Sequence, residues 1–206
     1  MIEVMKSEHH ETYDRIWELL EKGRSDRRHA FHTPVLATMN GAGDPDLRTV
    51  VLRRVDRGSR LICCHTDTRS PKVEAIRESG RVAWLFYDPE SRVQIRAHGQ
   101  CRIHSGADDA MTCETWSTVQ PHSRVCYYAP FAPSRELDQW KSNQPTNARE
   151  IASSPISSEK SPPDSFSILA TVLDSIEWLE LHHDGHRRIR FRVDHDGKPM
   201  AQWLAP

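Results

Sequence analysis

The stretch HTDTRSPK, residues 65–72, decides how the middle of this chain folds. It continues the run RLICC, residues 60–64, which is typical of a β-strand, and it ends where a helical pattern begins at Pro71. Ser70 suits the N-cap of that helix, and Pro71 suits its first position. Capping does not explain Arg69 and Lys72, because a helix N-terminus favours anions over cations. The stretch therefore indicates a strand and a helix N-terminus that together receive an anion.

The preceding stretch, RTVVLR at residues 48–53, adds two further arginines. Alternation along a strand places Arg48, Val50 and Leu52 on one face, and it places Thr49, Val51 and Arg53 on the other. An arginine at each end of an apolar strand is often only a solvated terminus. A functional role for these arginines is indicated only when the following strand, residues 60–66, is considered with them.

Antiparallel pairing across a turn at residues 57–59 brings Arg48 toward the end of the strand at residues 60–66. Arg48 is then expected to share one site with Thr66, Ser70 and Lys72. Cations and hydroxyl groups at a helix N-terminus suit a phosphate monoester. An empty barrel with a solvated basic rim is the alternative interpretation.

Strands dominate the rest of the pattern, and the sum favours a single β-barrel domain with helical additions. The segment at 82–87 is expected to be buried on both faces, and the long strand at 92–104 is expected to bend near Gly99. The expected helices are residues 8–23, 71–79 and 107–119, and the expected strands are residues 34–39, 47–55, 60–66, 82–87, 92–104, 166–181 and 200–204. Residues 1–30 form an N-terminal helical segment, residues 120–165 an irregular lid or linker, and residues 166–206 the C-terminal strands.

Composition excludes several classes of function. The 206 residues include 28 Lys plus Arg and 29 Asp plus Glu, so the net charge is -1. Such a balance offers no electrostatic footprint for nucleic acid or for an anionic membrane. No apolar run is long enough to span a bilayer, and the N-terminus does not resemble a signal peptide. The five cysteines lack C-x-x-C spacing and indicate reduced, mostly packed thiols in a cytoplasmic protein.

Histidines gather at residues 182–186, HHDGH, but this pattern does not predict a metal site. Adjacent His182 and His183 are expected on opposite faces of a strand, and Asp184 and Gly185 are expected to form a tight hairpin turn. Zinc needs three or four converging ligands. The chain also lacks a nucleophile elbow and a glycine-rich phosphate loop, so no catalytic residue is assigned.

Four ordered blocks together resemble the pyridoxamine 5'-phosphate oxidase-like FMN-binding family: residues 48–53, 65–72, 81–87 and 92–96, followed by a terminal WLAP at residues 203–206. The resemblance implies a split β-barrel that binds FMN at a homodimer interface. It implies that residues 48–53 lie along the flavin and that Thr66, Ser70 and Lys72 hold its phosphate. Gln94 would come from the partner subunit, and Arg190 matches a late flavin-binding arginine. The flavin-binding residues implied in this way are Arg48, Thr49, Val50, Val51, Leu52, Arg53, His65, Thr66, Arg69, Ser70, Lys72, Gln94 and Arg190.

Departures from the family pattern concern the substrate site. Pro71 stands where the oxidases have an arginine, and Arg69 is expected to supply the missing charge. The family's Tyr, Arg and Ser substrate contacts fall at Trp116, Gln120 and Arg124. Residues 186–188, HRR, replace an Arg-x-His motif, and Leu179 rather than Trp178 falls at a flavin-contacting tryptophan.

The resemblance therefore implies an FMN-dependent oxidoreductase acting on an unidentified small substrate. The alternatives are a genuine pyridoxamine 5'-phosphate oxidase and a flavin-binding carrier or sensor without turnover.

Overall fold

A computed structural model describes residues 2–156, 161–194 and 197–206, so parts of the expected N-terminal, lid and C-terminal segments lie outside the described residues. Most strands join one antiparallel sheet in the order β2-β1-β5-β6-β7-β4-β3, and β8 and β9 extend it beside β7. The strands are β1 (Val35–Met39), β2 (Pro45–Thr49), β3 (Leu52–Asp56), β4 (Leu61–Asp67), β5 (Arg81–Asp88), β6 (Val93–Ser105), β7 (Phe166–Glu180), β8 (Arg187–Val193) and β9 (Pro199–Leu204).

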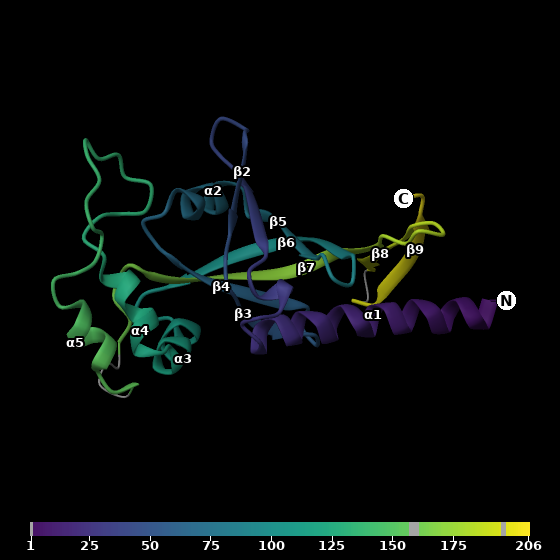
Figure 1. Cartoon of the computed structure of the whole chain (residues 1–206), viewed down its shortest axis with the longest axis horizontal. Coiled ribbons are helices and arrows are strands. Elements are labelled where there is room, and N and C mark those ends of the chain that lie inside the picture. The colour runs from purple at the N-terminus through teal and green to yellow at the C-terminus, as the bar shows by residue number, and fades with distance from the viewer. Residues whose placement is uncertain (1, 157–160, 195–196) are drawn as a thin grey trace.

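Helix α1 lies on one side of this sheet, α2 lies on the other side, and α3, α4 and α5 lie at one end (Figure 1). Helix α1 runs along the sheet and begins earlier than the expected residue 8. The short helices at residues 110–153, with the irregular chain around them, form a lobe beyond the start of β7, which we call the helical lobe. The helices are α1 (Ile2–Ser25), η1 (Ala30–His32), α2 (Pro71–Ser79), α3 (Ala110–Thr118), α4 (Pro121–Arg124), η2 (Val125–Tyr128) and α5 (Ala148–Ser153).

The sheet curls because its two end strands are neighbours in the chain. β2 ends at Thr49 and β3 begins at Leu52, yet these strands stand at opposite ends of the strand order. Two intervening residues span only about 7–10 Å, so the ends of the sheet must meet. The expectation of one strand over residues 47–55 is wrong, because the chain turns at Val50 and Val51, where the Val50 amide donates to the Pro34 carbonyl. The result is a split barrel, as expected from the sequence.

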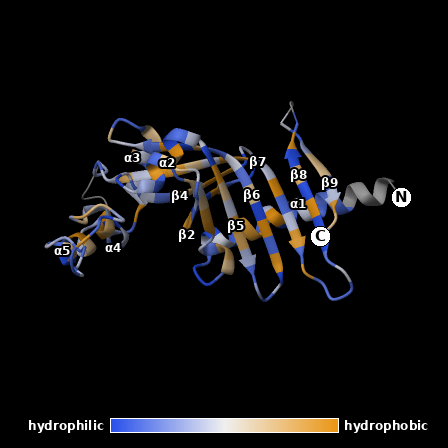
Figure 2. Ribbon diagram, turned by 90° about the horizontal axis from the view of Figure 1, so that it is seen from above, coloured by the Kyte–Doolittle hydropathy of each residue, from blue (hydrophilic) through white to orange (hydrophobic). Residues whose placement is uncertain are grey.

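Two apolar clusters hold the fold together. The larger one lies inside the barrel under α1 and includes Ile16, Leu20, Trp84 and Ile95. The smaller one joins the sheet to the helical lobe and is centred on Trp116 and Phe166, whose ring centroids lie 4.9 Å apart. Alternating hydrophobic and hydrophilic bands along the strands show one face turned toward the core (Figure 2). β5 follows this alternation, so the expectation that it is buried on both faces is wrong: Val82, Trp84 and Phe86 are buried, whereas Tyr87 is exposed.

The bend near Gly99 is confirmed, and its cause is a close approach between β6 and β7. The pairing register shifts between His98 and Gly99. A Cβ atom at Gly99 would lie 2.2 Å from the carbonyl oxygen of Val172 and 2.8 Å from the Thr171 side chain. Glycine is therefore required by backbone contact at this bulge.

We predict that Gly99→Ala lowers the free energy of unfolding by about 2–4 kcal/mol, because β6 and β7 must separate to admit the methyl group. Urea unfolding followed by far-UV circular dichroism measures this loss. Gly41→Ala is the matched control, since its Cβ would meet only the Glu78 carboxylate, at 3.6 Å. Equal stability of the two variants would contradict the assignment.

Candidate functional site

The structure brings Thr66, Ser70 and Lys72 together where β4 passes into α2. The ammonium of Lys72 donates to the Thr66 hydroxyl at 3.0 Å and to the Ser70 hydroxyl at 2.6 Å. Ser70 is the N-cap residue of α2 and Pro71 begins the helix, as expected, but the Ser70 side chain does not cap it. The hydroxyl accepts from Lys72 instead. We call these three residues with Arg48 the cation-hydroxyl cluster.

Arg48 reaches this cluster by a route that differs from the expected one. It lies on β2 opposite Leu36 of β1, and it does not pair with β4. Its guanidinium donates to the buried Thr38 hydroxyl at 2.9 Å, to the Leu36 carbonyl at 3.2 Å and to Asp46. Closure of the barrel brings β2 back toward α2, so that the positive charge of Arg48 acts on Lys72.

The cluster carries a positive charge that is only partly offset. Burial, followed by the charge of Arg48, lowers the pKa of Lys72. Two of the three ammonium protons are engaged, and no described residue accepts the hydroxyl protons of Thr66 or Ser70. The cluster therefore offers at least three free donors beside two cations, which is the donor set that a phosphate monoester requires.

Arg69 lies in the same turn but is held elsewhere. Its guanidinium binds the Asp67 carboxylate through Nε at 3.0 Å and through a terminal nitrogen at 2.6 Å, and it also donates to the Ala129 carbonyl. Arg69 thus ties the β4–α2 turn to the helical lobe. In this arrangement Arg69 does not replace the positive charge of the family arginine at the position of Pro71, contrary to the expectation.

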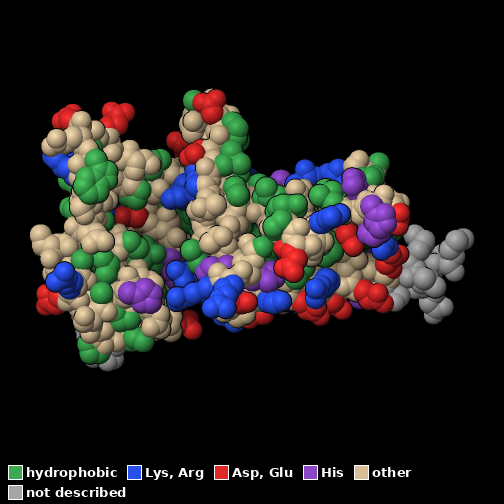
Figure 3. Space-filling view, in the orientation of Figure 1, with side chains coloured by type: hydrophobic (Ala, Val, Ile, Leu, Met, Phe, Trp, Pro, Cys, Tyr) green, Lys and Arg blue, Asp and Glu red, His purple; other side chains and the backbone are tan. Residues whose placement is uncertain are grey.

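A hollow of about 630 Å³ opens directly beside the cluster. Thr66 belongs to both, and the opposite wall comes from the helical lobe. In the space-filling view the molecule is deeply notched between this lobe and the β1–β2 hairpin (Figure 3). The lobe contributes chiefly Tyr127, Phe131, Asn143 and Gln144. These residues lie in the expected lid or linker, residues 120–165, where the absence of a periodic pattern gave no signal for individual side chains.

His65 separates this large hollow from a second one of about 310 Å³, and it lines both. Its ring packs edge-on against Phe166 at 5.2 Å. Burial, followed by the positive charge of Arg53, lowers the pKa of His65 to about 4. The imidazole is therefore neutral at physiological pH and offers one donor and one acceptor.

The side chains of residues 48–53 are not all accessible to a ligand. Leu52 is fully buried in the barrel core, and Val50 packs against the same core. The Leu52 side chain is therefore withdrawn from any ligand, whereas Val50 is only partly buried. Thr49 and Arg53 are exposed, and Val51 is partly buried at the turn.

Gln94 and Arg190 lie far from the cation-hydroxyl cluster within one chain. Thr66 pairs with Ser167 near the start of β7, whereas Gln94 pairs with Leu179 near its end. Twelve residues of strand separate these positions, which is roughly 40 Å along β7. Arg190 is opposite Glu177, and its guanidinium donates to Gln202 at 3.2 Å. Gln94 and Arg190 share the outer face of the sheet with Leu179, whereas Trp178 is buried in the core.

Arg124, which stands where the family has a substrate-contacting serine, is a structural residue. It is 1 % exposed, and its guanidinium donates to the carbonyls of Trp116, Val119 and Ile156 at 2.9–3.1 Å. Trp116 is fully buried beneath it, with the guanidinium carbon 4.8 Å from the indole centroid. Of the three positions compared with the family's substrate contacts, Gln120 alone is exposed, and it lines the smaller hollow.

Arg188 is also engaged. It donates to one carboxylate oxygen of Glu177 at 2.8 Å, and Arg96 donates to the same oxygen. Although burial opposes the effect, these hydrogen bonds lower the pKa of Glu177. Arg188 is therefore not available to restore charge at the expected substrate site.

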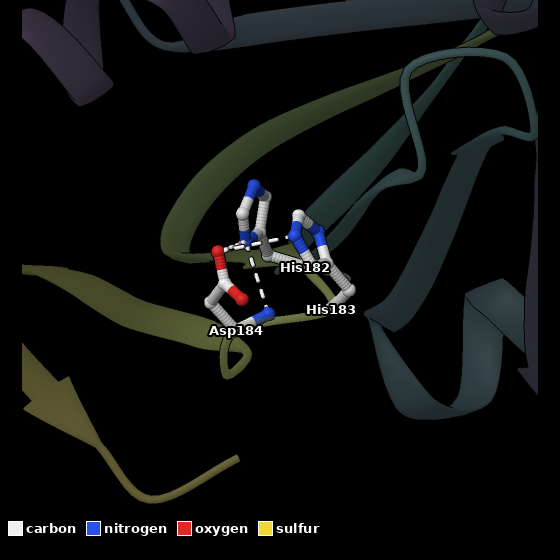
Figure 4. Close-up of side chains that lie close together, drawn as sticks. All are labelled: His182, His183 and Asp184. Carbon is white, nitrogen blue, oxygen red and sulfur yellow. Dashed lines mark hydrogen bonds and ion pairs between the residues drawn. The ribbon is translucent and has the colours of Figure 1, made fainter.

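His182, His183 and Asp184 gather at the tip between β7 and β8 (Figure 4). The two imidazole centroids lie 4.4 Å apart, so the expectation that these rings face opposite ways is wrong. The Asp184 carboxylate lies 3.1 Å from His183 Nε2 and 3.8 Å from His182 Nδ1. All three side chains are exposed, and no metal ligation is assigned to them.

The cysteines are free thiols, as expected. Burial raises the pKa of Cys63 to about 12 and of Cys101 to about 11, and it raises that of Cys64 further. Cys113 is partly buried and Cys126 is exposed, so the packing is less complete than expected. Among the described residues, no helix is long and apolar enough to span a bilayer.

Comparisons with known proteins bear on the fold and on the family resemblance. Residues 14–105 match the family model described as pyridoxamine 5'-phosphate oxidase, FMN-binding domain. The pyridoxine/pyridoxamine 5'-phosphate oxidase of Chromobacterium violaceum is 27 % identical over 186 residues, which cover 83 % of this chain and 77 % of that protein. The corresponding oxidase of Coxiella burnetii is 35 % identical over 66 residues, which span only 32 % of this chain and 33 % of its own length.

Solved structures support the fold. A pyridoxamine 5'-phosphate oxidase-related, FMN-binding protein of Nostoc punctiforme superposes with a TM-score of 0.74 at 23 % identity, covering 94 % of this chain and 96 % of its own. PhzG of Burkholderia lata, solved with tetrahydrophenazine-1-carboxylic acid, gives 0.65 at 20 % identity, covering 85 % and 82 %. The fold is that of the FMN-binding split-barrel proteins. At these identities the solved structures show the fold alone. The family model and the curated relatives make the chain similar to the pyridoxamine 5'-phosphate oxidases, in line with the resemblance found in the sequence.

The depressed pKa of His65 predicts a pH dependence of stability. The unfolded chain binds a proton between pH 6.5 and about 4 that the folded chain does not bind. The free energy of unfolding therefore falls as pH decreases through this window, by at most about 3 kcal/mol from this residue. Urea unfolding at several pH values should show that His65→Gln reduces the fall. An unchanged pH dependence in the variant would contradict a buried neutral imidazole.

Proposed function

We propose that the cation-hydroxyl cluster binds the phosphate of FMN and that the adjoining large hollow receives the rest of the cofactor. The single observation that carries this proposal is Lys72, partly buried and held by two hydroxyl oxygens beside Arg48. The matched FMN-binding domain supports the choice of cofactor. The family-implied contacts from Arg53, His65, Gln94 and Arg190 remain part of the proposal.

The residues present fit the group. A phosphate at the cluster would accept hydrogen bonds from the third ammonium proton of Lys72 and from the hydroxyls of Thr66 and Ser70. It would also relieve the repulsion between Lys72 and Arg48. The neutral His65 ring lies on the path from the cluster toward the smaller hollow, where it can donate or accept a hydrogen bond without adding charge.

We predict that Lys72→Met weakens FMN binding by about 1.5–3 kcal/mol, or roughly 10- to 150-fold, because charge-assisted hydrogen bonds to the phosphate are lost. Quenching of flavin fluorescence during titration measures the affinity. Arg77→Met on the same helix is the matched control, since Arg77 pairs with Glu74. A protein that does not quench flavin fluorescence would refute the proposal, and so would equal affinities of the two variants.

A homodimer with two shared flavin sites is the proposed assembly. It is supported by the separation of Gln94 and Arg190 from the cluster, because one chain cannot bring both ends of β7 to one ligand. A twofold axis would place the outer face of one protomer beside the cluster of its partner, and twofold dimers are the commonest oligomers. Small molecules rather than nucleic acid or membranes are the proposed further partners, and a cytoplasmic location remains a prediction from the sequence.

Sedimentation equilibrium of the FMN-loaded protein at micromolar concentration should report twice the 23.7 kDa chain mass. Arg190→Gln should then weaken FMN binding, although Arg190 lies far from Lys72 in its own chain. Arg102→Gln, an exposed arginine elsewhere on β6, should not. A monomer that retains full FMN affinity would contradict the shared site.

The proposed activity is that of an FMN-dependent oxidoreductase acting on a small substrate. A bound flavin would supply hydride and electron transfer, while the protein supplies binding, orientation and exclusion of water. The rival functions are a carrier or sensor without turnover and a genuine pyridoxamine 5'-phosphate oxidase. The latter is disfavoured because Trp116 and Arg124 are buried and Arg188 is bound by Glu177.

We predict that FMN-loaded protein oxidises pyridoxamine 5'-phosphate far more slowly than about one turnover per second, which lies within the ordinary enzyme range. Oxygen-dependent formation of pyridoxal 5'-phosphate, followed by absorbance, measures this rate. Turnover near one per second would establish the genuine oxidase. Stopped-flow reduction by NADH or NADPH separates the other functions, since rapid flavin reduction favours an oxidoreductase and its absence favours a carrier.

A further inference from the structure

Two adjacent arginines of β3 line the same hollow, although alternation along a strand would place them on opposite faces. Leu52 pairs with Cys64 and Arg54 pairs with Cys63, so Arg53 is the extra residue of a β-bulge. A bulge redirects side chains locally. Arg53 and Arg54 therefore both line the smaller hollow of about 310 Å³ beneath α3.

A third arginine, Arg27, reaches this hollow from the turn after α1. Within the described residues, none of the three guanidinium groups has a hydrogen-bond or ion-pair partner, whereas most arginines of the chain are paired. Glu114 is the one acidic residue among those that line the hollow. Figure 3 shows Lys and Arg side chains gathered over β3, at the boundary with the helical lobe. The hollow thus has an excess of unpaired positive charge.

The remaining walls suit a small organic molecule rather than a bare ion. Cys63, Val119 and Ile168 are buried apolar residues at the base. Hydroxyl and amide groups from α3 and the following turn stand among them, namely Thr115, Thr118, Gln120 and Ser123. The volume lies at the lower end of the range for ligand pockets, about 300–1,000 Å³. His65 lies between this hollow and the one proposed for the flavin, and it lines both.

We infer that this hollow binds the carboxylate of a small organic acid, and that Arg54 and Arg27 determine specificity for its negative charge. The inference rests on the proposed function, because it places this acid beside the flavin as the substrate. One guanidinium satisfies a carboxylate through two parallel hydrogen bonds. A phosphate dianion would need several donors in a fixed frame, whereas these arginines are exposed and unbraced, and Glu114 would repel a second negative charge.

Isothermal titration calorimetry with three probes tests this inference, on the full chain with and without added FMN. Benzoate presents a carboxylate, benzyl alcohol is a neutral molecule of similar size, and phenyl phosphate presents a dianion. We expect benzoate to bind at least about tenfold more tightly than benzyl alcohol, as for a charge-assisted contact. Failure of benzoate to bind, or tighter binding of phenyl phosphate, overturns the carboxylate assignment.

Variants then locate the contact. Arg54→Gln and Arg27→Gln should each weaken benzoate binding by about three- to tenfold, and Glu114→Gln should strengthen it, because the competing carboxylate is gone. Arg28→Gln is the matched control, since Arg28 neighbours Arg27 but does not line the hollow. Structural damage would not produce an increase at Glu114. Equal affinities of the Arg27 and Arg28 variants, or an unchanged affinity of Arg54→Gln, overturn the inference.

The FMN titration separates this inference from the proposed function. Arg54→Gln and Arg27→Gln should leave the FMN dissociation constant unchanged, since neither residue belongs to the proposed flavin contacts. If the protein fails to bind FMN, the proposed function fails, and benzoate binding to the flavin-free chain still tests the hollow. If FMN binds and benzoate does not, the hollow assignment alone is refuted.

Discussion

Closure of the sheet onto itself is the constraint on which the candidate site depends. Two residues, Val50 and Val51, connect strands that stand at opposite ends of the strand order. This short connection draws Arg48 on β2 toward Lys72 on α2. The two residues are far apart in the sequence, and β2 does not pair with β4, the strand that leads into α2. The repulsion between these cations would favour opening the barrel, and the buried core under α1 opposes it. A bound anion would remove this conflict.

Much of the fold could be predicted from the sequence, because the strands alternate and their boundaries carry strong turn and capping residues. Pro71 begins α2 and Gly99 marks the bend in β6, as expected. The break at Val50 and Val51 could not be predicted, since both residues favour strands and the turn is imposed by barrel closure. The bulge at Arg53 could not be predicted either, because it depends on the pairing register between β3 and β4.

The site shows the same division. Thr66, Ser70 and Lys72 of the cation-hydroxyl cluster could be identified, since they follow one another closely around a helix N-terminus, whereas the route that brings Arg48 to them depends on barrel closure. The buried position of Arg124 could not be, because a charged residue in a segment without periodicity is ordinarily exposed. Its three carbonyl partners come from α3 and from the chain after α5, and only the folded lobe brings them together. The distance from Lys72 to Gln94 likewise depends on the length of β7.

Burial of the adjacent thiols on β4 bears on how the chain withstands oxidants. The thiolate, not the thiol, reacts with peroxide and with electrophiles. Because burial raises the pKa of Cys63 and Cys64 well above neutrality, almost none of either residue is ionised, and the covering side chains exclude reagents. The Cys63 sulfur therefore lies beside the smaller candidate ligand hollow without being open to chemical attack there. We expect covalent labelling of the folded chain at Cys113 and Cys126 of the helical lobe, which are the cysteines that are not buried.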